Sequence, residues 1–383
     1  MAEAYIVEAL RTAGGRRNGA LAGWAPADLA AEILDALVEC TGIDPMAIDD
    51  VVMGCVNAFG EQSGQIGRSA VLASNLPVSI PAVTVDRQCG SSQQAIQFAA
   101  QAVMSGTQDV VIAAGVESMT RVPMGSTRGG TSSITRRIRE RFGVDGFNQF
   151  LGAQMIADKH GLTREEMDAY ALASHRRAAA ATEAGAFARE IVPLTIETPD
   201  GPRQHSRDEG IRYDASAESI AGVKLLQEGG TLTAATSSQI CDGAAGVLVV
   251  SATALKQHRL SPLARIHSMT VTAGDPVVML ETPIAATERA LQRAGMNIDD
   301  IDLAEVNEAF ASIPLAWLKA SGATHERTNV NGGAIALGHP LGASGAKLTA
   351  TLVHTLRARG GRYGLQTMCE GGGTANVTIL EAL

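Results

Sequence analysis

Cysteine, aromatic residues and long apolar runs are all scarce in this sequence of 383 residues. Its five cysteines include no Cys-x-x-Cys pair, so they indicate reduced thiols rather than a disulfide framework or a zinc site. No apolar run approaches the roughly 20 residues that a membrane-spanning helix requires. With 31 basic and 40 acidic residues, the net charge of −9 argues against general binding of nucleic acid.

Targeting signals are also missing from both ends of the sequence. Residues 1–11 lack the basic segment followed by an apolar segment that marks a secretory signal. Residues 380–383 do not form the peroxisomal Ser-Lys-Leu address. We therefore expect a cytoplasmic protein without contact to a membrane.

Small apolar side chains make up most of what is present. Hydrophobic residues account for 45% of the chain and charged residues for 19%, which is typical of a globular protein. Aromatic residues are only 3%, and 41 residues are glycine, so we expect close packing of small side chains and many tight turns. The length favours two or three structural units that share an extensive core.

Short β-branched segments alternate with Ala-rich amphipathic segments along the chain. Strands that are apolar throughout and are separated by helices indicate a sheet that is buried on both faces. The expected strands are residues 4–8, 50–54, 82–85, 110–114, 246–250, 303–306 and 363–368, and the expected helices are residues 26–40, 64–73, 91–105, 164–184 and 345–357.

The order of these segments predicts two similar α/β halves and one long insertion. The second part of the chain repeats the plan of the first, with a strand followed later by a helix and another strand. Between them lies a stretch rich in Gly, Ser and Thr, an arginine cluster at 136–141 and a Pro- and charge-rich segment. We predict an N-terminal half of residues 1–117 and 241–262, an inserted loop domain of residues 118–240, and a C-terminal half of residues 263–383.

Cys89 is the first candidate for chemistry. A predicted strand ends just before it and a predicted helix begins just after it, so its sulfur should lie at the positive end of a helix dipole. That position favours the thiolate, which is the reactive form of cysteine. On its own, Cys89 would fit a buried core cysteine as well, and Cys40, Cys55 and Cys241 are interpreted in that way.

His339 and Cys369 lie in glycine-rich surroundings. Like Cys89, both are expected to follow strand ends, where open α/β sheets build their sites. Glycines on both sides of His339 allow the backbone to approach a ligand closely, and the following proline keeps this histidine off a regular helix face. Cys369 follows a predicted strand and precedes Gly371-Gly372-Gly373, whose N–H groups could form a nest for an oxyanion. A flexible turn would explain the glycines equally well. No histidine has the spacing of a metal ligand, so we expect no metal site.

Six stretches together resemble the thiolase family, in family order and over essentially the whole chain. They are Arg87-Gln88-Cys89-Gly90-Ser91, Gly115 to Ser118, Asp242-Gly243-Ala244-Ala245, Asn307-Glu308-Ala309-Phe310, Asn331-Gly332-Gly333 with Gly338-His339-Pro340, and Cys369 with Gly371-Gly372-Gly373. The resemblance implies a layered αβαβα core with an inserted loop domain. It also implies a homodimer or homotetramer and the cleavage of 3-oxoacyl-CoA by coenzyme A, with acyl-CoA and CoA as its partners.

The resemblance also implies a role for each candidate residue. Cys89 would take the acyl group as a thioester, His339 would deprotonate Cys89, and Cys369 would move the proton at the α-carbon or on CoA. One oxyanion hole would use His339 and a water held by Asn307, and the other would use the N–H groups of Cys89 and Gly371. A soft nucleophile, an acid–base group and two oxyanion holes are what this chemistry requires.

The same resemblance places the CoA-binding residues. Ser238 matches the serine that contacts the pantetheine arm, and Phe310 should help to line that arm. Coenzyme A would be a co-substrate, and no tightly bound cofactor is expected. The arginine cluster at 136–141 either meets the CoA phosphates or lies on a solvated or oligomer-facing helix.

Two departures from the family pattern bear on the substrate. Glu370 stands where many members carry an apolar residue, and it would raise the pKa of Cys369 if its carboxylate faced that thiol. Phe150-Leu151-Gly152 replaces the His-Met-Gly that is common in short-chain acetoacetyl-CoA members. Both features favour a degradative enzyme for longer or bulkier chains, for example steroid-derived ones.

Three other functions remain open at this stage. A biosynthetic thiolase that condenses two acetyl-CoA would use the same residues in reverse. A β-ketoacyl synthase would have a second active-site histidine where this chain has Cys369. A non-catalytic acyl-CoA or sterol carrier on the same scaffold would have no use for Cys89, His339 and Cys369 together.

Overall fold

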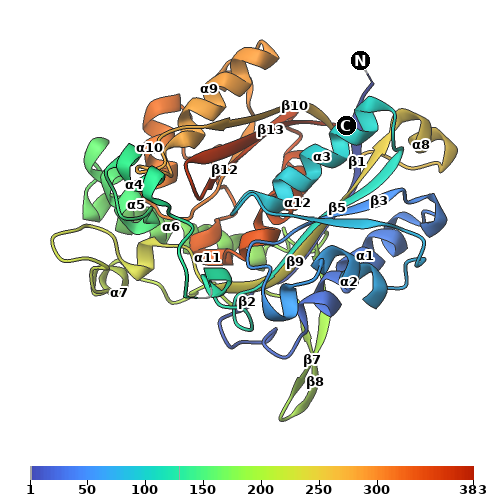
Figure 1. The fold of residues 1–383 in the computed structure, drawn as a ribbon, viewed down its shortest axis with the longest axis horizontal. Helices are drawn as coiled ribbons and strands as arrows, with labels where there is room; N and C mark the ends of the chain where they lie inside the picture. Colours follow the sequence, from blue (N-terminus) through green and yellow to red (C-terminus); the bar gives the residue numbers. More distant parts are fainter. Residues whose placement is uncertain (1, 129) are drawn as a thin grey trace.

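A single large mixed sheet forms the centre of the computed structural model, which describes residues 2–128 and 130–383 (Figure 1). Nine strands follow one another across this eleven-stranded sheet, and the short strands β2 (Gly15–Arg16) and β6 (Ile191–Val192) pair with it at the side. In spatial order the nine are β11 (Leu303–Val306), β12 (Tyr363–Glu370), β13 (Thr374–Ala382), β10 (Ala264–Ala273), β1 (Ala4–Thr12), β9 (Cys241–Ser251), β5 (Val110–Ser118), β3 (Asp50–Gly54) and β4 (Ala82–Val85).

The two halves of the sheet have the same plan. In one half, β3 and β5 are parallel, and β5, β9 and β1 follow in antiparallel order. In the other half, β11 and β12 are parallel, and β12, β13 and β10 are antiparallel. The halves join where β1 pairs with β10 through Tyr5↔Arg265 and Ile6↔Ala264. The repeat predicted from the sequence is therefore present as a structural repeat.

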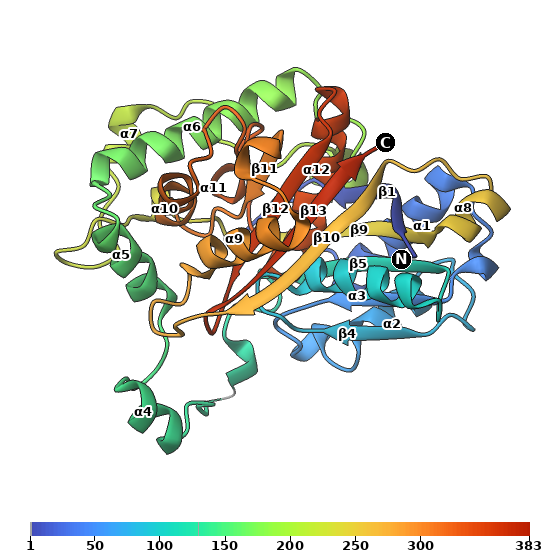
Figure 2. The same cartoon turned by 90° about the horizontal axis from the view of Figure 1, so that it is seen from above.

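Helices cover the sheet in three layers. The outer layer of one half consists of α1 (Pro26–Thr41) and α2 (Ile66–Ala73), and that of the other half contains α9 (Thr282–Ala294) and α10 (Ser312–Ser321). The central layer consists of α3 (Ser91–Ser105) and α12 (Ser344–Ala358), which pack against each other and against strands of both halves (Figure 2). This arrangement confirms the predicted αβαβα fold.

Small side chains allow the central layer to be buried on every side. Ala95 and Ala99 of α3 and Ala346 and Ala350 of α12 are all buried in one cluster with strand residues from both halves. Larger side chains would hold the two helices and the two half-sheets further apart, because protein interiors are close-packed. The low aromatic content of the sequence is thus a requirement of this layer.

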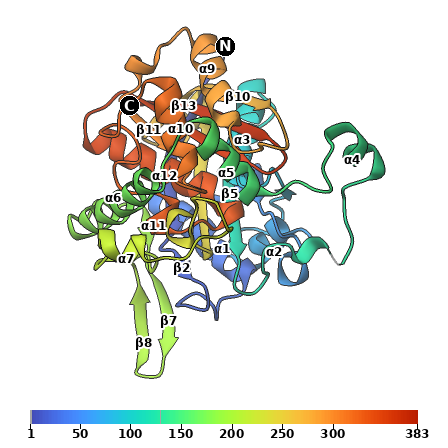
Figure 3. The same ribbon diagram turned by 90° about the vertical axis from the view of Figure 1, so that its left-hand side faces the viewer.

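Among its described residues, the insertion contributes four α-helices and a hairpin. The helices are α4 (Arg136–Phe142), α5 (Gln149–Lys159), α6 (Arg164–Glu183) and the short α7 (Ala217–Ala221), and the hairpin is formed by β7 (Leu194–Thr198) and β8 (Gly201–His205). Both α4 and the hairpin project from the body of the molecule (Figure 3). The division at residues 118 and 240 stays a prediction. In the described part of the chain, no helix is long and apolar enough to cross a membrane.

Most predicted elements are present, but several strands were missed or were predicted too short. β5 continues to Ser118 and β9 begins at Cys241, so both are longer than predicted. β10, β13 and the hairpin were not predicted. β13 carries buried polar residues such as Asn376 and Thr378, which hide its apolar alternation. These buried polar groups belong to the region around the candidate site.

Candidate active site

Cys89 lies in a tight turn between β4 and α3, as predicted. The carboxylate of Asp86 accepts a hydrogen bond from the Gln88 N–H at 2.7 Å, and the Ser91 hydroxyl accepts one from the Arg87 N–H at 2.9 Å. Gln88 has a φ of 49°, which is unusual for a residue with a side chain. The turn therefore holds Cys89 two residues before Ser91, the first residue of α3.

The surroundings of Cys89 do not stabilise a thiolate at rest. Burial raises the pKa of the Cys89 thiol well above its usual range, and the neighbouring Cys369 and Glu370 raise it further. These effects raise the pKa more than the positive end of α3 lowers it. The position before a helix is therefore not enough to keep Cys89 as a thiolate. A base is needed to remove the proton of Cys89.

His339 carries a buried imidazole that is neutral at pH 7, so one ring nitrogen has a lone pair that can accept a proton. Burial lowers the pKa of His339 to about 3, and the cation of Lys347 contributes to the shift. The sequence placed His339 after a strand, which is wrong: it follows the short helix α11 (Ala334–Leu337) and Gly338, whose φ is 80°. The backbone N–H of His339 donates to the Gln239 carbonyl at 3.0 Å.

Ser344 determines which ring nitrogen of His339 carries the proton. The Ser344 hydroxyl donates to the Pro340 carbonyl at 2.9 Å, so it can only accept from His339 Nδ1, which lies 2.5 Å away. The neutral ring is then protonated on Nδ1 and has its lone pair on Nε2. Asn307 Nδ2 lies 3.4 Å from Nε2 and is consistent with that lone pair. Sequence reasoning missed this role of Ser344, although a hydroxyl five residues after His339 was visible.

Cys369 lies beside both Cys89 and Asn307. Burial raises the pKa of the Cys369 thiol to about 12, while hydrogen bonds from the Asn307 side chain and from the backbone N–H of Cys369 itself oppose the rise. Cys369 in turn raises the pKa of the neighbouring Cys89 thiol. These contacts link Cys89, Cys369, Asn307 and His339 into one group. The sequence placed Cys369 after a strand, but it lies within β12 and pairs with Ala375.

Glycines form the turn between β12 and β13 that follows Cys369. Gly372 and Gly373 have φ values of 82° and 78°, which favour glycine. Gly371 lies against the turn of Cys89, since a Cβ on it would be 2.8 Å from the Gln88 side-chain oxygen. The predicted oxyanion donors, Cys89 and Gly371, therefore belong to neighbouring turns.

Glu370 is a buried carboxyl group. Its Oε1 packs on Gly90, where an added Cβ would be only 1.8 Å away. Burial raises the pKa of Glu370 to about 7, while the Thr374 side chain and the cation of Arg87 oppose the rise. The carboxyl thus lies under the Cys89 turn and raises the pKa values of both active-site thiols.

Glu370→Gln should stabilise the protein increasingly as the pH rises from 4.5 to 7. Below pH 4.5 the carboxyl is protonated in the folded and the unfolded state, whereas between these values it ionises first in the unfolded state and favours unfolding. The gain in the free energy of unfolding should reach at most about 3 kcal/mol above pH 7. Chemical denaturation at several pH values measures it, with the exposed Glu183→Gln as control. A pH-independent difference for Glu370→Gln would contradict the prediction.

The predicted CoA-binding residues Ser238 and Phe310 lie next to each other. The Ser238 N–H donates to the Ala309 carbonyl at 2.9 Å, and Phe310 is buried with its ring 5.4 Å from that of Phe150 in an edge-to-face contact. The arginine cluster at 136–141 lies on the exposed helix α4, where Arg136 pairs with Glu140 at 2.7 Å.

A close backbone contact holds the loop after His339 against the N-terminal half. A Cβ on Gly115 would be 2.2 Å from the Gly342 carbonyl oxygen, and the Gly342 N–H donates to the buried carboxylate of Glu117 at 2.9 Å. Within residues 2–128 and 130–383, no group of three or more His, Cys, Asp or Glu side chains is placed to hold a metal ion.

Comparison with known proteins identifies the family. The thiolase N-terminal domain matches residues 4–253, and the thiolase C-terminal domain matches residues 260–382. The chain belongs to the thiolase family. This confirms the resemblance that was inferred from the motifs around Cys89, His339 and Cys369.

Individual thiolases align with the chain over nearly their whole length. A steroid 3-ketoacyl-CoA thiolase of Mycobacterium tuberculosis is 54% identical, covering 100% of this chain and 95% of its own. A 3-ketoacyl-CoA thiolase of Cronobacter sakazakii is 41% identical, and the alignment covers 100% of this chain and 100% of that one. The crystal structure of human mitochondrial 3-ketoacyl-CoA thiolase superposes with a TM-score of 0.90 at 34% identity, covering 100% of this chain and 99% of that one. The αβαβα core is thus the thiolase fold.

Proposed function

We propose that the protein is a degradative thiolase that cleaves 3-oxoacyl-CoA with coenzyme A as co-substrate and without a tightly bound cofactor. The observation that supports this best is the grouping of the half-buried Cys89 with Cys369, Asn307 and a neutral His339. A non-catalytic carrier has no need for this combination of two thiols, an amide and a neutral imidazole. Membership of the thiolase family supports the same chemistry.

In the first half-reaction, Cys89 attacks the 3-oxo carbon of the substrate. His339 Nε2 takes the thiol proton, because the ring is neutral at pH 7 and has the lone pair on this nitrogen, where among the described residues it faces only the long contact from Asn307. The bond between C2 and C3 then breaks, which leaves the acyl group on Cys89. The Cys369 thiol protonates C2 of the departing enolate, so that acetyl-CoA (propionyl-CoA from a 2-methyl substrate) leaves and Cys369 becomes a thiolate.

In the second half-reaction, coenzyme A takes the acyl group from Cys89. The Cys369 thiolate accepts the proton of the CoA thiol, and the CoA sulfur attacks the thioester carbonyl. Cys89 leaves as a thiolate and recovers its proton from His339, which restores every group. The high pKa of Cys369 suits this step, since a strongly basic thiolate is a good acceptor for the CoA proton.

Each half-reaction creates an oxyanion that needs its own donors. We assign one oxyanion hole to His339 and a water held by Asn307, and the other to the N–H groups of Cys89 and Gly371. The neighbouring turns of Cys89 and Gly371 support the second assignment. The Oδ1 atom of Asn307 is buried without a protein partner among the described residues, and it supports the first.

The acyl group of the substrate is proposed to be long or bulky. Phe150, Leu151 and Met155 of α5 are exposed apolar side chains, and Phe150 contacts Phe310, which we assign with Ser238 to the pantetheine arm. The Mycobacterium tuberculosis relative is named a steroid thiolase. The competing assignment is the condensation of two acetyl-CoA, which is supported by a 42% identical acetyl-CoA acetyltransferase of Chromobacterium violaceum that covers 99% of this chain and 99% of its own.

Longer or branched 3-oxoacyl-CoA esters should exceed acetoacetyl-CoA in kcat/KM. Each additional buried methylene contributes about 0.8 kcal/mol of apolar transfer free energy, and the exposed side chains of α5 offer the required surface. A series of 3-oxoacyl-CoA substrates of increasing chain length, assayed with saturating CoA, measures this. Equal or higher kcat/KM with acetoacetyl-CoA would favour the biosynthetic assignment instead.

The protein is also expected to be a homodimer or homotetramer. β4 is the last strand of the sheet path, and Val83 on it and Val78 just before it are exposed. Unpaired edge strands with exposed apolar residues are typical of surfaces that pair with another chain. Light scattering at micromolar concentration should show a dimer or a tetramer. A stable and fully active monomer would contradict this expectation.

A further inference from the structure

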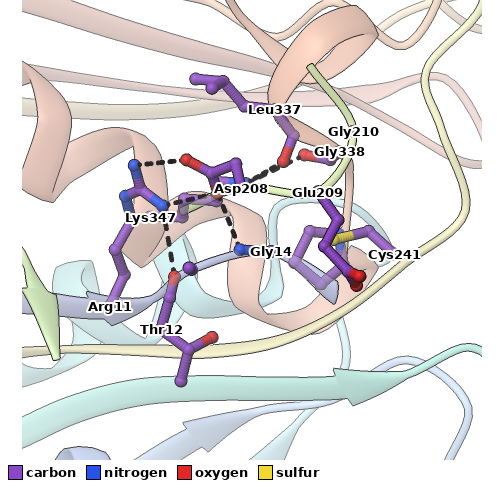
Figure 4. A network of polar contacts seen from close by, with 12 residues as sticks. Arg11, Thr12, Gly14, Asp208, Glu209, Gly210, Cys241, Leu337, Gly338 and Lys347 are labelled. Atoms are coloured by element: carbon purple, nitrogen blue, oxygen red, sulfur yellow. Dashed lines mark hydrogen bonds and ion pairs between the residues drawn. The ribbon is translucent and has the colours of Figure 1, made fainter. Parts of the chain in front are cut away.

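A network of buried charges lies beside Leu337 and Gly338, the two residues before His339 (Figure 4). Arg11 of β1 binds Asp208 of the insertion through two hydrogen bonds of 2.8 and 3.0 Å, and it binds Glu190 through Nε at 2.6 Å. Lys347 of α12 lies 3.7 Å from Asp208 Oδ1. Two cations thus balance two carboxylates, which is a condition for burying charges. The network joins residues from both halves and from the insertion.

Lys347 connects this network to the catalytic loop. Its Nζ donates to the Leu337 carbonyl at 2.5 Å and to the Gly338 carbonyl at 3.3 Å. These are the last two carbonyls before His339, and they lie at the C-terminal end of α11, where backbone carbonyls lack helical partners. A cation at this end of a helix is favourable, because the helix dipole is negative there.

The loop is held from its other side by close packing. A Cβ on Gly14 would be 2.8 Å from the Leu337 carbonyl oxygen, and one on Gly338 would be 2.6 Å from the Cys241 sulfur. The Gly14 N–H donates to Asp208 Oδ1 at 2.7 Å, so the same carboxylate orients this neighbour as well. The hydrogen bonds from Lys347 and the close packing of Gly14 and Cys241 therefore together fix the backbone of Leu337 and Gly338.

We propose that Lys347 is a positioning residue for the reaction, which fixes the backbone just before His339, and that Asp208 holds the Lys347 ammonium group in place. This inference rests on the proposed role of His339 as the base for Cys89. Lys347 acts through His339 and is not itself in contact with the reacting atoms. The insertion contributes to catalysis through Asp208, which holds Lys347, and Lys347 in turn holds the loop of the C-terminal half before His339.

The charge of Lys347 has a second effect on the same histidine. Burial is the larger cause of the low pKa of His339, and the Lys347 cation lowers this pKa further because it disfavours a second positive charge nearby. The titratable groups nearest to Lys347 are Asp208, Cys241, Glu190 and Arg11, and the two carboxylates balance the two cations. Removal of Lys347 thus loosens the peptide before His339 and weakens the preference for the neutral ring.

Lys347→Met tests the proposal, because methionine fills the space of the lysine stem without donating hydrogen bonds. Asp208 stays paired with Arg11 in this variant, so it is not left as an isolated charge. We expect kcat to fall by about 10²-fold, which is the effect of moving a catalytic group by about 1 Å, while KM stays within about twofold. Lys347→Arg keeps the charge and the donors and should recover most of the activity. Thr351→Val is the matched control. Thr351 lies on the same helix as Lys347, and its replacement removes a hydrogen bond to Glu190 but leaves the carbonyls before His339 unchanged.

Each outcome of this series decides the question. Wild-type kcat in folded Lys347→Met, a loss equal in Lys347→Arg and Lys347→Met, or a loss in Thr351→Val as large as in Lys347→Met would overturn the proposal. If Lys347→Met does not fold, Lys347→Gln takes its place, because its amide keeps N–H donors but is uncharged and shorter than lysine. Its kcat should then lie below that of Lys347→Arg, and equal values would contradict the role. Absence of thiolytic activity in the wild-type protein would instead refute the proposed function.

Discussion

Cys89→Ala is expected to abolish thiolytic cleavage and to lower kcat by about 10⁴-fold or more, as the removal of a covalent nucleophile does in other enzymes. The half-buried thiol lies before α3 and next to Cys369, whose own thiol is buried, and we assign the acyl-enzyme to Cys89. The consumption of 3-oxoacyl-CoA in the presence of CoA measures the loss. The variant should fold, since the substitution removes a single sulfur atom from a partly exposed position.

A second cysteine provides the control for this substitution. Cys40 is exposed on α1, away from the contacts that link the site, and Cys40→Ala should retain wild-type kcat. If Cys89→Ala kept more than about one hundredth of the wild-type kcat, general acid–base effects alone, typically about 10²–10⁴-fold, would be sufficient to explain its role. Covalent catalysis by Cys89 would then be excluded.

Cys369→Ala should separate the two halves of the reaction. Thioester exchange needs only Cys89, His339 and an oxyanion hole, whereas a proton on carbon needs a correctly placed acid–base group. The variant should therefore still be acylated on Cys89 by acyl-CoA. It should fail in the step that forms or breaks the carbon–carbon bond, with turnover reduced by about 10²–10⁴-fold or more.

Incubation of Cys369→Ala with acyl-CoA in deuterated water measures both steps in one sample. Acylation of Cys89 without exchange of the α-hydrogen is the expected result, while wild-type protein should show both. Exchange at the wild-type rate in the variant would assign the carbon acid–base role to another group, such as His339 or the buried Glu370. Because these residues act as a unit, the losses in Cys369→Ala and His339→Ala are not expected to add.

The sequence predicted the fold because its local signals agree with one another. The strand at 82–85, the tight turn and the helix at 91–105 were all visible, so the position of Cys89 was predictable from local pattern alone. The faint repeat between the two parts of the chain correctly indicated two halves with the same plan. Each of these features depends on residues that are close together in the sequence.

Features that depend on distant residues could not be predicted. The strand position of Cys369 depends on its pairing with Ala375 across the glycine turn, and the neutral state of His339 depends on burial between both halves. The charge of Lys347 is balanced by Asp208, which is 139 residues away along the chain (347 − 208). The thiolate that the helix dipole favours is suppressed by burial and by Glu370, and only the folded structure shows how close that carboxyl lies.

Peptide mass spectrometry after brief incubation of the wild-type protein with acyl-CoA tests the central claim most directly. The mass of one acyl group should appear on the peptide that contains Cys89, and it should disappear when free CoA is added. The peptides that contain Cys369 and Cys40 should stay unmodified. An acyl group on Cys369 in place of Cys89 would contradict the assignment of the nucleophile, and the absence of any acylated cysteine would contradict the covalent mechanism.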